Sequence, residues 1–211
     1  MPTQSKFRLD LNKKEKIRYN IVKRKDMPEV LIFAGANGSG KTTIANSVLK
    51  PNQRFINADD IKDRRNLSYI EAGKKALLMI DKAISQKINF SFETTMSGLG
   101  LLKRFKELKN RGYNITILYL FVYPVELLVE RIKERVRKGG HRVEDEDIVR
   151  RYYRSVRNFW KIYRFYANKW VILNNNEFEY KEVAIGGGRD FYIIDDFEFK
   201  MFKEVVKNAK S

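Results

Sequence analysis

The stretch that decides the fold is VLIFAGANGSGKTT, residues 30–43, where an apolar run leads into three glycines, a lysine and two threonines. Glycine loses more backbone entropy on folding than other residues, so three glycines within six positions indicate unusual backbone angles or close approach by another molecule. The spacing from Gly35 to Thr42 is G-x-x-x-x-G-K-[ST]. That spacing is typical of a loop whose backbone N–H groups wrap the phosphates of a nucleotide.

The residues on either side of this loop support the same interpretation. Residues 30–34 are continuously apolar, as expected of a strand buried on both faces, and residues 41–49 carry apolar side chains at helical spacing. A helix N-terminus adds positive charge for an anion. A glycine-rich turn that only resembles the motif is the alternative. The sequence predicts a nucleoside triphosphate, ATP, bound by Gly35, Ala36, Asn37, Gly38, Ser39, Gly40, Lys41, Thr42 and Thr43, with the Thr42 hydroxyl on Mg²⁺.

Length and composition bound the class of protein. A chain of 211 residues with 43% hydrophobic and 33% charged residues fits one globular domain with a substantial core. It has no apolar run long enough to cross a bilayer and no apolar signal core near residue 1. It has no cysteine, which excludes disulfides and thiolate metal sites and agrees with a reducing cytoplasm. We therefore expect a cytoplasmic protein without a membrane partner.

The net charge of +17 is the unusual quantity, and it favours anionic partners such as nucleic acid or phosphorylated substrates. Residues 1–28 carry nine Lys/Arg against three Asp/Glu, and residues 131–164 carry twelve against five. The first stretch is interpreted as a basic N-terminal arm, with solvation as its simplest role. The second stretch, residues 131–164, contains arginines that are candidates for phosphate binding.

The order of apolar segments predicts an α/β fold. Expected strands cover residues 30–34, 54–58, 88–94, 114–122 and 170–174, and helices cover residues 41–49, 69–86, 99–110 and 124–138, the last beginning at Pro124. A long helix rich in arginine and tyrosine, a hairpin within residues 181–195 and a last helix from about Phe197 follow. Alternating strands and helices predict a parallel sheet of about five strands with helices on both faces. Ligands in such sheets bind beyond the carboxyl ends of the strands.

Asp59 directly follows the second expected strand, in FINADDIK. Phosphoryl transfer needs positioning, charge neutralisation and one base for the acceptor hydroxyl, and a carboxylate at this edge suits that role. The structural alternative is that Asp59 or Asp60 caps the next helix.

Glu93 and Thr95 end the third expected strand, in FSFETT. A glutamate buried in an apolar strand without a partner is costly, so we expect Glu93 to face the ligand crevice and, with Thr95, to bind the acceptor. Solvent exposure at the strand end is the alternative. The fourth strand, by contrast, runs into Tyr123-Pro124 without a carboxylate, which favours small-molecule phosphoryl transfer over a mechanical ATPase.

The basic region after the fourth strand has the layout of a lid at about residues 137–150. Arg131, Arg135 and Lys138 fall on one helix face, a glycine pair follows, and more arginines begin the next helix. Arginine stays charged and binds phosphate bidentately. Solvated helix faces with ion pairs are the alternative for most of these side chains. We assign catalytic roles to Arg135 and Arg151 and a hydrogen bond to substrate or loop to His141, the single histidine and no metal ligand.

Taken together, GANGSGKTT, NADD, FETT, ERVRKGGHRV and IVRRYYRS resemble the zeta-toxin-like P-loop kinases over roughly residues 29–176. The resemblance implies a P-loop NTPase fold like that of nucleotide and shikimate kinases, and transfer of phosphate from ATP to UDP-N-acetylglucosamine under restraint by an antitoxin protein. It places Lys41 and Thr42 on phosphate and Mg²⁺, Asp59 as base, Glu93 and Thr95 on the sugar nucleotide, and Arg135 and Arg151 in the lid. Asn57 and GGHRVEDED depart from the pattern of the cell-wall toxins, and these departures bear on the identity of the sugar more than on the reaction type.

The sequence therefore predicts a basic arm at residues 1–28 and a P-loop kinase-like domain at residues 29–211 that phosphorylates a hydroxyl of a small acceptor. The rival is an NTP-dependent nucleic-acid-binding protein, with the +17 charge as its footprint. Aromatic residues interleaved with basic ones between residues 152 and 163 would serve such a protein, but helical spacing also suits core packing.

Overall fold

The computed structural model describes residues 27–139, 143–177 and 180–209. Most of the expected arm, residues 1–26, and the expected contact residue His141 lie outside the described residues. The strands are β1 (Glu29–Gly35), β2 (Phe55–Ile56), β3 (Phe90–Thr94), β4 (Asn114–Phe121), β5 (Lys169–Asn174), β6 (Lys181–Gly187) and β7 (Asp190–Ile193). The helices are α2 (Lys41–Val48), α3 (Ala58–Arg65), α4 (Tyr69–Ser85), α5 (Leu102–Asn110), α6 (Glu126–Arg137), α7 (Asp145–Lys161), η1 (Tyr163–Tyr166) and α8 (Asp196–Asn208).

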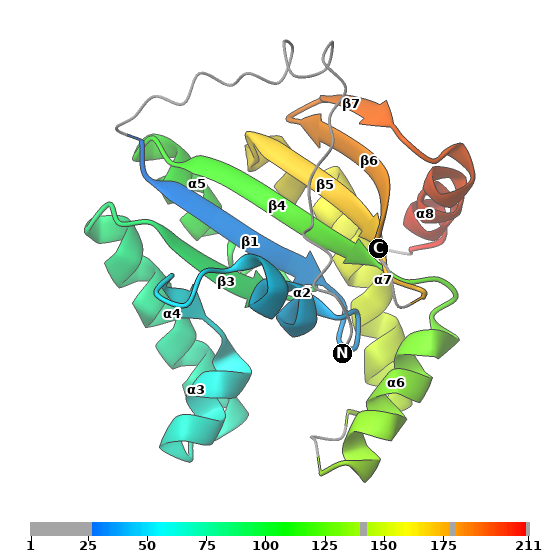
Figure 1. The fold of residues 1–211 in the computed structure, drawn as a ribbon, viewed down its shortest axis with the longest axis horizontal. Coiled ribbons are helices and arrows are strands. Elements are labelled where there is room, and N and C mark those ends of the chain that lie inside the picture. The colour runs from blue at the N-terminus through cyan, green and yellow to red at the C-terminus, as the bar shows by residue number, and fades with distance from the viewer. Residues whose placement is uncertain (1–26, 140–142, 178–179, 210–211) are drawn as a thin grey trace.

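One sheet runs through the described fold, in the order β2-β3-β1-β4-β5-β6-β7 (Figure 1). The first five strands are parallel, which confirms the α/β prediction. The expected count of about five is too low, because the C-terminal hairpin is part of the sheet. β6 pairs antiparallel with β5, β7 pairs with β6, and the sheet has seven strands.

The buried strands divide their side chains between two cores. Along β1, Ile32 and Ala34 face the larger core, and Phe33 faces the smaller one. The larger core lies under α4, α5, α7 and α8, whereas α2 covers the smaller core on the other face (Figure 1). Burial on both faces explains why the central strands are apolar throughout.

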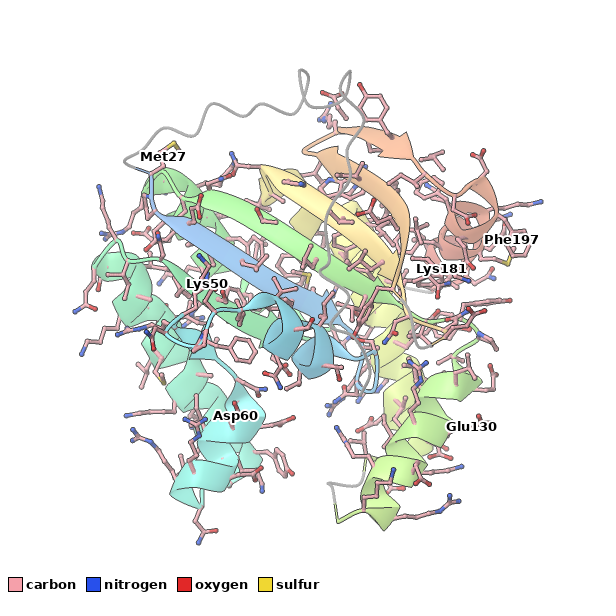
Figure 2. All side chains as sticks on the ribbon, in the orientation of Figure 1. Met27, Lys50, Asp60, Glu130, Lys181 and Phe197 are labelled. Atoms are coloured by element: carbon pink, nitrogen blue, oxygen red, sulfur yellow. The ribbon has the colours of Figure 1, made fainter. Side chains whose placement is uncertain are left out.

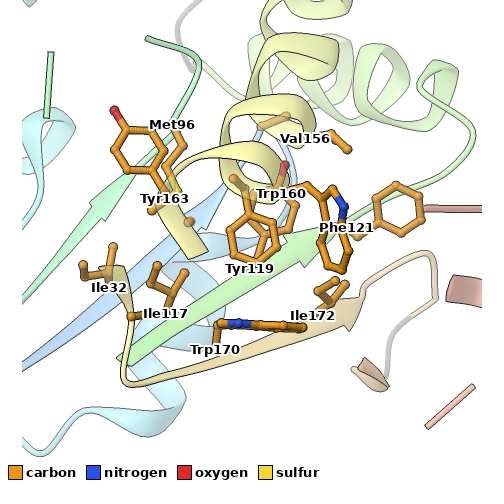
Figure 3. Packing of buried hydrophobic residues seen from close by; sticks show 14 of the residues in the cluster. Ile32, Met96, Ile117, Tyr119, Phe121, Val156, Trp160, Tyr163, Trp170 and Ile172 are labelled. Carbon is orange, nitrogen blue, oxygen red and sulfur yellow. The ribbon is translucent and has the colours of Figure 1, made fainter. Parts of the chain in front are cut away.

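Aromatic rings fill the larger core between the sheet and α7 (Figure 3). Tyr119 of β4 stacks on Phe159 of α7 with ring centroids 4.1 Å apart, and Trp160 meets Trp170 of β5 edge-on at 5.8 Å. Phe159 and Trp160 belong to the basic, aromatic segment, residues 152–163, that a nucleic-acid-binding protein would expose. Since Tyr152, Phe159, Trp160 and Tyr163 are buried, their helical spacing reflects core packing.

Helix boundaries follow local chemistry. Ser68 and Glu71 form a reciprocal capping box at the start of α4, as residues of these types do. Pro124 does not begin the next helix as expected; it lies two residues before Glu126, and the Tyr123–Pro124 peptide bond is cis. The second strand is also shorter than predicted, because Ala58 already belongs to α3. No helix among the described residues is both long and apolar enough to span a membrane.

Candidate functional site

The glycine-rich loop of residues 35–43, named the phosphate loop, leads from β1 into α2. It lies at the carboxyl ends of the parallel strands, as the sequence predicts. Gly35 has φ +141° and Gly40 has φ +92°, so the loop uses backbone angles that side chains disfavour. A Cβ on Gly35 would lie 2.5 Å from the Leu120 carbonyl oxygen. Gly40 is the N-cap of α2, and no side chain caps that end. The first amide groups of α2 therefore remain available to an anion.

Lys41 is buried beneath the loop, with 8% of its surface exposed. Its ammonium group donates to the carbonyl of Ala36 at 3.0 Å. Burial lowers the pKa of Lys41, the nearby carboxylates of Glu93 and Asp59 oppose that effect, and Arg135 adds to it. The lysine, two carboxylates and an arginine thus share one electrostatic environment.

Glu93 lies against the phosphate loop. The Thr42 hydroxyl donates to Glu93 Oε2 at 2.8 Å, because β3 is the direct neighbour of β1 in the sheet. The sequence assigned Glu93 to the acceptor and found no acidic residue after the fourth strand. In the structure, β3 carries the carboxylate that lies beside the predicted Mg²⁺ hydroxyl.

Asp59 lies in the first turn of α3 and is not its cap. Asn57 is the N-cap, and its Oδ1 accepts the N–H of Asp59 at 2.8 Å. The capping alternative for Asp59 or Asp60 is therefore wrong. Because Asn57 satisfies the helix end, the carboxylate of Asp59 is left to line the site.

Two adjoining cavities open at this end of the sheet. The first, about 410 Å³, lies over the phosphate loop and is named the phosphate cavity; the second, about 1010 Å³, lies between α3, α6 and α7 and is named the outer cavity. Both are lined by Asn37, Asp59 and Arg135. Helices α3 and α6, which carry the labelled Asp60 and Glu130, project on either side of this region (Figure 2). Asp59 and Arg135 therefore lie where the two cavities meet.

The predicted site residues divide between these cavities. Lys41, Thr42, Asp59, Glu93, Thr95 and Arg135 all line the phosphate cavity. The hydroxyl oxygens of Thr95 and Ser97 lie 2.9 Å apart, within hydrogen-bond distance. Arg151 lines only the outer cavity and pairs with Asp147 at 3.6 Å. The structure thus brings these residues together with Asn37, Gly38, Gly40 and Thr43 of the predicted ATP site, and it sets Arg151 farther out.

Three side chains near the loop had no predicted role at the nucleotide. Arg131 lines the phosphate cavity and donates to the Asn176 carbonyl at 3.0 Å. Asn175 donates to the Ser39 carbonyl at 2.8 Å, and the Tyr180 hydroxyl lies 3.4 Å from the Gly40 carbonyl. Asn175 directly follows the fifth strand, so the rule that ligands bind beyond strand ends would have found it.

The residues present fit a magnesium nucleotide. Ser39 Oγ and Asn37 Oδ1 are buried and, among the described residues, have no hydrogen-bond partner. Mg²⁺ is usually held by one or two protein oxygens together with substrate phosphates, and Thr42 with Glu93 supplies such oxygens. The described residues contain no group of three His, Cys, Asp or Glu side chains that would hold a metal by themselves.

Comparison with solved structures shows the same fold in other proteins. Crystal structures of the AvrRxo1-ORF1:AvrRxo1-ORF2 complex with sulphate ions and with ATP match with TM-scores of 0.68 at 13% and 14% identity. The matches cover 88% of this chain and 65% of that one, so this chain spans just under two thirds of its length. The PezAT toxin–antitoxin system of Streptococcus pneumoniae matches with a TM-score of 0.55 at 15% identity, covering 93% of both chains.

Sequence comparison identifies the family. An uncharacterized protein of Haemophilus influenzae is 36% identical over 129 residues, which are 59% of this chain and 92% of that protein. The family model "Zeta toxin" matches residues 13–180, which include the phosphate loop, both carboxylates and α6. The P-loop kinase-type fold and this match lead to one conclusion: the chain belongs to the zeta toxin family.

Proposed function

We propose that the protein is an ATP-dependent phosphotransferase that moves the γ-phosphoryl group of ATP to a hydroxyl of a small acceptor. The observation that supports this proposal most strongly is the junction of the two cavities. Asp59 and Arg135 line both, so a donor in the phosphate cavity and an acceptor in the outer cavity would meet at these side chains. A base and a cation at that point are what phosphoryl transfer requires.

In this proposal the phosphate loop and α2 hold the triphosphate through backbone N–H groups. Lys41 neutralises charge on the terminal phosphates, and Arg135 faces the same cavity from α6. Thr42 and Glu93 would hold Mg²⁺, which neutralises charge on the transferring group. The AvrRxo1 complex that contains ATP, with a similar fold, supports the choice of nucleotide.

The transfer step is an in-line displacement. The acceptor oxygen forms a bond to the γ-phosphorus while the bond from that phosphorus to the bridging oxygen of ADP breaks. Asp59 accepts the proton that the acceptor hydroxyl loses. Lys41 and Arg135 stabilise the negative charge that develops on ADP and on the transferred group.

The outer cavity is large enough for a small-molecule acceptor. Its lining mixes carboxylates, such as Asp63 and Asp147, with cations, such as Lys62 and Arg151. Carboxylates accept hydrogen bonds from hydroxyls and arginine binds phosphate, so a phosphorylated sugar such as a UDP-sugar remains the proposed class. Thr95, which lines the phosphate cavity, and His141, which lies outside the described residues, stay predictions for acceptor binding. By analogy with PezAT, we also propose an antitoxin protein as partner.

A second candidate function, nucleic-acid binding, is favoured by the +17 charge alone. Against it, most of the interleaved aromatic residues, Tyr152, Phe159, Trp160 and Tyr163, are buried, and several basic side chains of this region pair with carboxylates three or four positions away. Filter binding of RNA and DNA at two salt concentrations separates the two functions. A nucleic-acid-binding protein would lose affinity steeply with added salt, through counterion release. The kinase proposal expects no tight complex at the higher salt concentration.

The proposed function is tested by incubating the protein with γ-labelled ATP, Mg²⁺ and a panel of sugar nucleotides, nucleosides and short RNAs. The expected result is label on one class of small molecule. Label found only as free phosphate in every reaction would contradict a phosphotransferase, and label on RNA would support the rival. The Lys41→Ala variant controls for contaminating kinases.

A further inference from the structure

Asn174, the last residue of β5, and the two asparagines that follow it form a bridge between the phosphate loop and the C-terminal part of the chain. The side-chain amide of Asn175 donates to the Ser39 carbonyl at 2.8 Å, across 136 positions of sequence. In such loops the N–H groups face the phosphates. A donor on the carbonyl of Ser39 therefore restrains the peptide unit that joins Ser39 to Gly40.

Asn175 also leaves no room for a side chain at position 40, which is a glycine. A Cβ on Gly40 would lie 2.4 Å from Asn175 Nδ2 and 3.5 Å from the Tyr180 hydroxyl. Two side chains from beyond β5 thus pack directly against the loop at the first turn of α2. A side chain at position 40, where φ is +92°, would therefore collide with Asn175.

The bridge is fixed at its other end. Asn176 accepts the Tyr123 N–H at 2.8 Å and donates to the Tyr123 carbonyl, and its own carbonyl accepts from Arg131. Asn174 accepts the Asn176 N–H at 2.7 Å and donates to Glu198 of α8. Asn175 is therefore part of a turn whose neighbours are held on both sides.

Glu198 belongs to a unit outside the family match. The "Zeta toxin" match ends at residue 180, and the hairpin β6–β7 with α8 follows it. This C-terminal unit, Lys181–Asn208, extends the sheet and reaches the asparagine turn through Glu198. Glu198 is itself placed by its N–H bond to Asp195, the N-cap of α8, at 2.9 Å.

We propose that Asn175 is a positioning residue that holds the phosphate loop in its nucleotide-binding conformation, and that the C-terminal unit supports Asn175 through the Glu198–Asn174 contact. The proposal rests on the proposed function, since it assigns Asn175 to the same nucleotide site. In this proposal neither Asn175 nor Glu198 touches the reacting atoms. Their effect is to pre-organise the loop, which lowers the ordering cost that nucleotide binding would otherwise include.

Asn175→Ala removes the donor to Ser39 and the packing against Gly40. The expected result is faster hydrogen exchange of the amides in residues 36–42 of the nucleotide-free protein. Affinity for magnesium ATP should fall about two- to twelvefold, the range for one lost hydrogen bond. Asn175→Asp keeps the shape but places a carboxylate against the Ser39 carbonyl, so its loss of affinity should be larger.

The matched control is Asn168→Ala. Asn168 Oδ1 accepts the Ile115 N–H at 3.0 Å, so this variant also loses one side-chain bond to the main chain, here to β4 and at the opposite end of β5. Exchange in residues 36–42 should stay as in the wild type. If Asn175→Ala leaves loop exchange and ATP affinity unchanged, or if Asn168→Ala accelerates loop exchange equally, the positioning role of Asn175 is overturned.

The support from the C-terminal unit is tested with Glu198→Ala and Glu198→Gln. Alanine removes the acceptor for Asn174 and should accelerate loop exchange, whereas glutamine keeps an acceptor oxygen and should restore the wild-type rate. Equal exchange in wild type and Glu198→Ala overturns this part of the proposal. If the wild type takes up no ATP, the proposed function fails, yet exchange in the nucleotide-free variants still decides whether Asn175 orders the loop.

Discussion

The Thr42 hydroxyl and the Glu93 carboxylate lie in hydrogen-bond contact at 2.8 Å, which joins the start of α2 to the end of β3. These two oxygens come from segments 51 residues apart in the chain. They meet because β1 and β3 are parallel neighbours whose carboxyl ends share one edge. Glu93 therefore lines the phosphate cavity and not the outer cavity.

Glu93→Gln should therefore alter the magnesium requirement. Glutamine keeps an oxygen for Thr42 but removes the charge that attracts a divalent cation. The Mg²⁺ concentration for half-maximal ATP turnover should rise roughly ten- to a hundredfold, as for other groups that support a metal ligand. Glu130→Gln on the exposed face of α6 is the control. An unchanged Mg²⁺ requirement with a raised KM for the acceptor would return Glu93 to the acceptor site.

Asp59→Asn should keep ATP binding and lose transfer, because the amide cannot accept the proton of the acceptor hydroxyl. A general base contributes about 10²–10⁴-fold to rate, so a loss of that size in kcat is expected. Asp60→Asn changes the same charge in the same turn, at a side chain that lines neither cavity, and should leave kcat unaltered. Equal rates for Asp59→Asn and wild type would remove Asp59 from the mechanism.

Asn57→Ala should weaken both the fold and the placement of Asp59. The cap bond to the Asp59 N–H is lost, which costs about 1 kcal/mol of unfolding free energy. Urea denaturation measures this change, and kcat should fall with it because α3 carries Asp59. Asn57→Asp retains a capping oxygen and should retain stability. If Asn57→Ala matches the wild type in urea, the cap does not stabilise α3.

Lys41→Met should raise the thermal stability of the nucleotide-free protein while weakening ATP binding by about tenfold or more. Burial lowers the pKa of Lys41 in the folded protein below its ordinary value of 10.5. Between the lowered pKa and 10.5 the unfolded chain holds more protons, so the contribution of Lys41 to stability rises with pH across that window.

The cost of the buried ammonium is thus fully present below the lowered pKa and disappears towards 10.5. The advantage of Lys41→Met in melting temperature should be largest near neutral pH and shrink as the pH approaches 10.5. Thermal melts of both proteins at several pH values provide the measurement. A methionine variant that is less stable than the wild type at neutral pH would contradict this expectation.

The apolar pattern of the chain predicted the parallel core of the fold because strands buried on both faces leave a continuous apolar run. It also placed Lys41, Asp59 and Glu93 at one edge, since each follows or ends a strand. The pattern missed the hairpin as part of the sheet, because edge pairing of β6 with β5 depends on contacts between distant segments. The prediction that a helix begins at Pro124 was also wrong, since α6 begins two residues later, at Glu126.

Assignments within the site were harder to predict. The order of the strands in the sheet decides which carboxylate faces the phosphate loop. The sequence FSFETT predicts a strand, β3, but it does not indicate that this strand pairs with β1. The arginines show the same limit. Helical spacing put Arg135 and Arg151 on suitable faces, but the packing of α6 against α7 places only Arg135 at the cavity junction.

The account depends most on occupation of the loop at residues 35–43 by a triphosphate, and calorimetric titration of the purified protein with ATP and Mg²⁺ measures that directly. The wild type should bind one ATP, and Lys41→Ala should bind it at least tenfold more weakly, since charge-assisted bonds to phosphate are lost. Lys50→Ala, at an exposed lysine just past α2, should bind like the wild type. No heat of binding with the wild type, or equal affinity in Lys41→Ala, would contradict the account.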